Sequence, residues 1–180
     1  MREFKSINLS LLLSELQGSI SEDVIMIASC NYGDHCSTQQ VIPLTGVEIG
    51  YVRESAYSNS GFKIIENDDE RQPDDQKVII LNPETNTNVD DALTAQQLEE
   101  CIEEILMQDT ELLETPITFG SPYGDRAGTI QANNADLYGM GECRVQESAY
   151  SSSGMALICE EDETEFDTDT DNDTNYYTIA

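Results

Sequence analysis

The chain has 180 residues, 38% of them hydrophobic, so it can bury the core of one domain or of two small ones, which argues against global disorder. It carries 36 acidic against 8 basic side chains, a formal net charge of −28. A field of that sign repels nucleic acid and anionic membranes and attracts basic proteins, which excludes direct nucleic-acid binding as a first interpretation. Halophilic adaptation is the alternative explanation for the charge.

The first half of the chain has the pattern of a helix followed by strands. Four leucines recur at helical spacing, with Asn8 before them as a suitable N-cap: Leu9, Leu12, Leu13 and Leu16. The elements expected next are strands at 24–28 and 62–65, an acidic stretch at 66–75 and a closing strand at 77–81.

The second half repeats this order. Thr94 followed by Gln97 is a capping box that opens a helix, and Leu98 and Ile102 begin its apolar face. The elements expected next are strands at 117–119 and 155–158, an acidic stretch at 160–173 and a closing strand at 176–179. Because a strand follows it, the second acidic stretch is predicted to be a long loop; a disordered tail is the alternative.

Two motifs recur in the same order along the chain. Residues 54–58, Glu-Ser-Ala-Tyr-Ser, return 93 residues later at 147–151, and Tyr32-Gly33-Asp34 returns 91 residues later as Tyr123-Gly124-Asp125. The predicted fold class is therefore α+β, a tandem repeat of two similar units. Each unit is expected to be one helix packed on a small, mostly antiparallel sheet of about four strands. The predicted division is a first unit at 1–83, a linker at 84–92 and a second unit at 93–180 with the acidic loop at 160–173.

Each unit resembles small uncharacterised α+β proteins encoded by phages and mobile elements. The resemblance is carried by the Leu-rich helix at 9–16, the glycine-containing Tyr32-Gly33-Asp34 loop and the closing strand before Leu81-Asn82-Pro83. It implies no known activity. It implies a setting in which acidic proteins mimic DNA and block nucleic-acid-binding defence proteins of the host.

The cysteines and the N-terminus predict a cytoplasmic protein, in the host cytoplasm if it is phage-encoded. Five cysteines are an odd number and form no dense framework, which indicates reduced thiols. Ser10, Ser14 and Glu15 interrupt the leucines, so the segment predicts an amphipathic helix and not a signal peptide. No stretch has the roughly 20 apolar residues that span a membrane.

Candidate metal ligands are sparse. Cys30, His35 and Cys36 cluster in the sequence, but their spacing is not that of a zinc site. Residues 167–171 alternate Asp and Thr like the start of a calcium loop, yet the glycine and the bidentate glutamate of an EF-hand are missing. We therefore expect no metal and no cofactor; a weak calcium site is the alternative.

The strongest functional signal is the acidic face of the second predicted helix. Its glutamates form like-charge pairs four residues apart, and each such pair destabilises a helix by about 0.2–0.5 kcal/mol. Repeated carboxylates can stand in for phosphates toward Lys and Arg. The predicted function is a non-catalytic, monomeric acidic protein that binds a basic, nucleic-acid-binding surface of a partner protein, as a phage-encoded DNA mimic that inhibits a host defence system. A solvated helix face is the alternative. The predicted contact residues are Glu99, Glu100, Glu103, Glu104, Asp162, Glu163, Asp167, Asp169 and Asp171.

The repeated loops favour an alternative function, a small-ligand-binding protein or a rare hydrolase. Glu54 and Glu147 would meet across a pseudo-twofold axis and share a proton, whereas a serine nucleophile has only His35 as a base. In a purely structural role, the serines would cap local amides. A chaperone-like protein with broad affinity for basic clients is a further alternative. The alternative site consists of Tyr32, Asp34, Glu54, Tyr57, Tyr123, Asp125, Glu147 and Tyr150.

Overall fold

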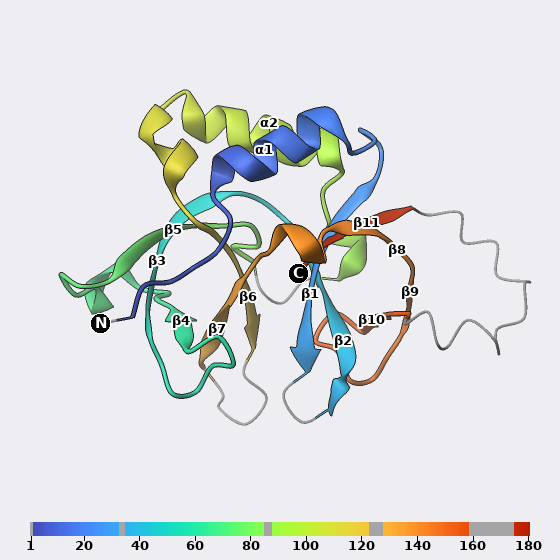
Figure 1. Ribbon diagram of the computed structural model, residues 1–180. Helices are drawn as coiled ribbons and strands as arrows, with labels where there is room; N and C mark the ends of the chain where they lie inside the picture. The colour runs from blue at the N-terminus through green and yellow to red at the C-terminus, as the bar shows by residue number, and fades with distance from the viewer. Residues whose placement is uncertain (1, 33–34, 85–87, 123–127, 159–174) are drawn as a thin grey trace, which may run out of the picture.

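The computed structural model describes residues 2–32, 35–84, 88–122, 128–158 and 175–180. Two α-helices, α1 (Leu9–Gly18) and α2 (Ala95–Leu106), lie side by side over one end of the strands (Figure 1). The side chain of Asn8 accepts a hydrogen bond from the backbone N–H of Leu11 at the start of α1. Thr94 and Gln97 form a capping box at the start of α2. Both predicted helix starts are confirmed.

The strands of the first half are β1 (Ile25–Tyr32), β2 (His35–Pro43), β3 (Glu48–Glu54), β4 (Phe62–Ile64) and β5 (Gln76–Ile80). Those of the second half are β6 (Ile117–Pro122), β7 (Ile130–Asn134), β8 (Gly141–Cys143), β9 (Val145–Glu147), β10 (Met155–Leu157) and β11 (Tyr176–Ile179). Short 3₁₀ helices are η1 (Asp68–Glu70), η2 (Val89–Asp91), η3 (Thr110–Glu114) and η4 (Leu137–Gly139). The class is α+β, as predicted.

The described strands form two sheets, and each sheet takes strands from both halves of the chain. One is a closed barrel in the order β3-β4-β7-β6-β5, and the other is a six-stranded sheet in the order β8-β11-β1-β2-β10-β9. The expected arrangement, in which each unit builds its own sheet of about four strands, is therefore wrong for the described strands. Strands pair through hydrogen bonds between backbone groups. The alternation of apolar and polar side chains predicts a strand but does not specify its partner strand.

The two sheets have corresponding registers. Gln40 of β2 lies opposite Ala156 of β10, and Gln131 of β7 lies opposite Lys63 of β4. The two glutamines are 91 residues apart and their partners 93, which are the offsets of the sequence motifs. Each sheet also contains one parallel pair, β1 with β11 and β5 with β6. β8 and β9 are separated by Arg144 alone, so the edges of the six-stranded sheet come from one nearly continuous segment.

In the described ranges, apolar side chains form two buried clusters. The larger lies between the helices and the sheets and includes Leu12 of α1, Ile102 of α2 and Phe119 of β6, each at most 1% exposed. The smaller surrounds Phe4 and Phe62, whose rings meet edge to face with centroids 5.3 Å apart. None of the helices in the described part of the chain is long and apolar enough to cross a membrane.

Candidate functional site

The two α-helices and η3 together form a surface that we call the helical layer, residues 9–18, 95–106 and 110–114. Its charged side chains are all acidic: Glu15, Glu99, Glu100, Glu103, Glu104, Glu111 and Glu114. The four glutamates predicted as contact residues all lie on α2. Glu100, Glu103 and Glu104 are exposed, and Glu99 is half-buried.

The apolar side of α2 positions these glutamates. Leu98 and Ile102 are fully buried, so the helix is held by packing against the core and turns its charged face outward. Glu103 and Glu104 lie in the last turn, where the helix dipole disfavours negative charge and where no basic side chain offsets it. Their positions therefore do not serve the stability of the helix.

The glutamates of the helical layer accept hydrogen bonds from neighbouring amide side chains and form no ion pair among the described residues. Gln17 of α1 donates from Nε2 to Glu99 Oε1 at 2.8 Å, and Asn8 Nδ2 donates to Glu114 Oε2 at 3.1 Å. Among the described residues the salt bridges join Arg53 to Asp75 and Lys77 to Asp109, so neither involves a glutamate of the layer. The layer therefore keeps its negative charge uncompensated.

The field of the layer acts on a neighbouring thiol. Burial raises the pKa of Cys101 on α2, and the negative charges of Glu104 and Glu100 raise it further. Cys101 therefore stays a neutral thiol at neutral pH, which adds no charge to the layer.

The rest of the predicted contact surface is not located. Asp162, Glu163, Asp167, Asp169 and Asp171 lie outside the described residues. The structure packs α2 against α1 and η3, which carry Glu15, Glu111 and Glu114, residues that the sequence did not associate with the α2 glutamates. Glu111 and Glu114 follow α2 closely in sequence, whereas Glu15 lies far from it, and α1 joins the layer only because the two helices pack together.

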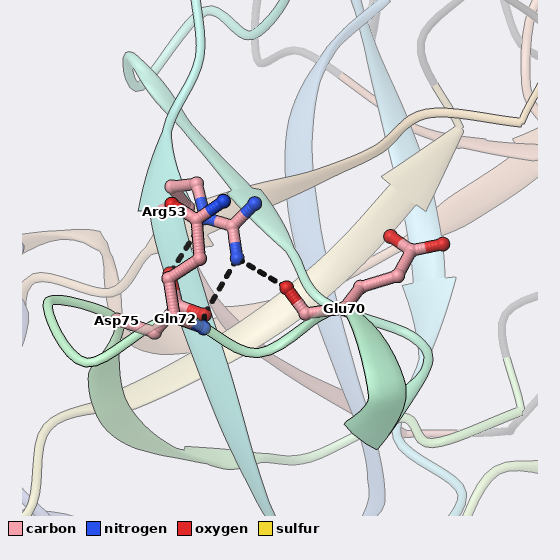
Figure 2. A network of polar contacts seen from close by, with 4 residues as sticks. All are labelled: Arg53, Glu70, Gln72 and Asp75. Carbon is pink, nitrogen blue, oxygen red and sulfur yellow. Dashed lines mark hydrogen bonds and ion pairs between the residues drawn. The ribbon is translucent and has the colours of Figure 1, made fainter.

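The first acidic stretch, 66–75, is an ordered segment that we call the acidic strap. The guanidinium of Arg53 donates to both carboxylate oxygens of Asp75 and, from Nη2, to the backbone carbonyl of Glu70 at 2.7 Å (Figure 2). The backbone N–H of Gln72 donates to the same carboxylate at 2.8 Å. The bond from Arg53 lowers the pKa of Asp75, and the same bond raises the pKa of Arg53.

The acidic strap thus differs from the helical layer in being partly neutralised. Besides Arg53, the guanidinium of Arg71 lies over the ring of Tyr51, 3.5 Å from its centroid. Sequence reasoning missed both roles. The available signal was that four of the eight basic residues of the chain lie in the strap or near it in sequence: Arg53, Lys63, Arg71 and Lys77.

The two Glu-Ser-Ala-Tyr-Ser loops have the same backbone closure. The N–H of Ser55 donates to the carbonyl of Gly61 at 2.8 Å, and the N–H of Ser148 donates to that of Gly154 at the same distance. Both glycines have positive φ, 82° and 78°, which only glycine adopts without strain. Gly61 and Gly154, which close the two loops, are therefore required by the turn.

The serines of these loops fasten hairpins from the other half of the chain. Ser153 Oγ donates to the backbone carbonyl of Val41 at 2.6 Å, and Ser60 Oγ donates to that of Ala132. The adjacent N–H of Asn59 donates to the side-chain oxygen of Gln131 at 3.2 Å. These contacts favour a structural role for the repeated motif.

The alternative site is only partly assembled. The rings of Tyr32 and Tyr150 approach to 6.5 Å between centroids. Glu54 lies in the barrel and Glu147 in the six-stranded sheet, at the ends of different strands. Tyr57 is 46% exposed. Asp34, Tyr123 and Asp125 lie outside the described residues.

A cavity adjoins the first of these loops. Its volume is about 470 Å³, and it is lined by Arg2, Glu54 and residues 55–61 apart from Tyr57. The lining is mostly serine, asparagine and charged groups, so it lacks the apolar walls typical of small-molecule sites. In the described ranges no three His, Cys, Asp or Glu residues gather as metal ligands.

Comparison of the chain with models of known protein families, with curated proteins and with solved structures gave no match.

Proposed function

We propose that this chain is a non-catalytic acidic protein that binds a basic surface of a nucleic-acid-binding partner, and that the helical layer is its docking face. One observation carries the proposal: seven acidic and no basic side chains share this layer, and no described ion pair neutralises its glutamates. Removing charges that repel one another would stabilise α2, so the arrangement calls for a cause outside the fold.

The physical basis is that carboxylates can take the place of phosphates as partners of Lys and Arg side chains. Proteins that bind nucleic acid gain most of their non-specific affinity from Lys and Arg contacts with regularly spaced phosphates. Glu99, Glu100, Glu103 and Glu104 present carboxylates on successive turns of one rigid helix, held by Leu98 on the opposite side. Such charges accelerate association and make it steeply dependent on salt.

We propose a phage or mobile-element protein that acts in the host cytoplasm as a DNA mimic against a defence protein, as a monomer and without a cofactor. The resemblance of residues 9–16 and of the Leu81-Asn82-Pro83 segment to such proteins supports this setting. The contact residues beyond the helical layer are proposed to be Asp162, Glu163, Asp167, Asp169 and Asp171.

We also infer that the chain is a tandem repeat. The support is the matched placement of both glutamines, Gln40 and Gln131, opposite strands that follow the repeated motif. The first residues of the two helices also make equivalent hydrogen bonds to the other half. The N–H of Leu9 donates to the carbonyl of Thr115, and the N–H of Ala95 donates to that of Val24.

The test is capture of partner proteins from a bacterial lysate at low and at high salt, with two matched variants. The layer variant replaces Glu99, Glu100, Glu103 and Glu104 by Gln. The strap variant removes the same number of charges through Glu66→Gln, Asp68→Asn, Asp69→Asn and Asp74→Asn. The proposal expects a nucleic-acid-binding protein that is captured at low salt, lost at high salt, lost with the layer variant and kept with the strap variant. Equal loss with both variants would show that net charge alone attracts the partner and would refute a docking face.

A further inference from the structure

Neither half of the chain completes a sheet alone. β1 pairs with β11 along four residues, from Ile25 opposite Tyr176 to Ala28 opposite Ile179. The barrel of β3, β4 and β5 closes only through the β6–β7 hairpin, which pairs with β5 on one side and β4 on the other. Each half therefore offers open strand edges that the hairpin of the other half fills.

The two halves of the chain also contact each other at the starts of the helices and at the repeated loops. Asn8, which caps α1, forms a β-bridge with Pro116 before β6, and Thr94, which caps α2, forms one with Ile25 of β1. The serine hydroxyls of each repeated loop hold the incoming hairpin, Ser60 at Ala132 and Ser153 at Val41. Strand pairs, helix entries and loops thus all join one half to the other.

We propose that this chain is the covalent fusion of a hairpin-exchanged dimer, in which the hairpin and strand edges of each half form an interaction surface that fits a second copy of the same unit. The inference rests on the tandem repeat proposed above, and it does not require that the helical layer binds a partner. A closed twofold arrangement explains why both contacts occur twice with corresponding residues. It assigns the binding of the partner half to strand pairing, so the connection at 84–92 is not needed to hold the halves together.

The helical layer depends on this exchange. α1 comes from the first half, and α2 and η3 come from the second. Their contact includes the hydrogen bond from Gln17 to Glu99. The layer therefore exists only while the halves are associated.

The experiment uses the full-length chain with a protease recognition sequence in place of residues 85–87, cut after folding. We expect the two fragments to elute together at the size of the intact chain and to unfold in one transition. The unfolding midpoint of the cut protein should rise with its concentration, because folding now includes association, whereas that of the uncut protein should not. Fragments that separate under native conditions, or that unfold independently, would overturn the proposal.

Two further measurements keep the test decisive. Ser60→Ala and Ser153→Ala should each weaken association of the cut fragments by about two- to tenfold, the effect of one lost hydrogen bond. Ser14→Ala, on the exposed face of α1, is the matched control and should leave association unchanged. If the protease-site variant does not fold, hydrogen exchange on the unmodified chain decides: the amides of β1 and β11 should lose protection together, and independent loss would contradict the exchange.

Discussion

Arg53 holds both carboxylate oxygens of Asp75, with Nε 2.6 Å from Oδ1 and Nη2 2.7 Å from Oδ2. This fork-to-fork geometry is the strongest ion-pair arrangement that Arg and Asp form. It ties the end of the acidic strap to the C-terminal end of β3 and explains why a segment with six acidic residues follows a defined path (Figure 2).

Replacing Arg53 by Gln should lower the urea midpoint of unfolding and change its dependence on pH. Because the pKa of Asp75 is lowered in the folded protein, its contribution to stability is present above the ordinary aspartate pKa of about 3.9 and is lost as the pH falls below it. The difference between wild type and Arg53→Gln should therefore shrink with acidification. Arg144→Gln, at an exposed arginine, should show no such dependence. A constant difference at all pH values would contradict the assignment.

The layer variant with four Glu→Gln changes should be more stable than the wild type while it binds less. It removes two like-charge pairs on α2, each worth about 0.2–0.5 kcal/mol, so the free energy of unfolding should rise by about 0.4–1 kcal/mol at low salt. The gain should diminish at high salt because ions screen the repulsion. Urea denaturation at both salt concentrations measures it, and a loss of stability at low salt would disprove the uncompensated repulsion.

Tyr57→Ala and Tyr150→Ala separate the docking face from the alternative loop site. The loops after β3 and β9 lie away from the helices (Figure 1), so both variants should bind the partner as wild type does at every salt concentration. Binding measured by titration of the captured partner decides the question. A loss of affinity that salt does not alter would favour ligand binding at the repeated loops.

Gly154→Ala should destabilise the protein through backbone strain alone. Its φ is 78°, and a Cβ placed there would meet no atom within 4 Å, so about 1–2 kcal/mol is expected. Gly61→Ala combines a similar φ with a contact of 2.7 Å to Arg2 Nη1, and the flexible arginine can move away. The two costs, measured by urea unfolding, should therefore be similar. A much larger cost at Gly61 would show that Arg2 is firmly held.

The sequence by itself determined the local elements. The Asn8 cap, the Thr94–Gln97 capping box and the buried stripes of both helices depend on residues at most four positions apart, so their physics is contained in short segments. The α+β class, the strand that closes each half and the acidic face of α2 follow from the same short-range patterns.

Only the tertiary structure decided which strands are partners and which helical segments pack together. Strand pairing uses backbone groups that every residue carries, so no side-chain pattern revealed that β6 and β7 join β5 and β4. The Arg53–Asp75 pair and the packing of α1, which carries Glu15, against α2 also join segments that are far apart in the chain. Such contacts form because packing brings distant segments together, which a pattern of neighbouring residues does not encode.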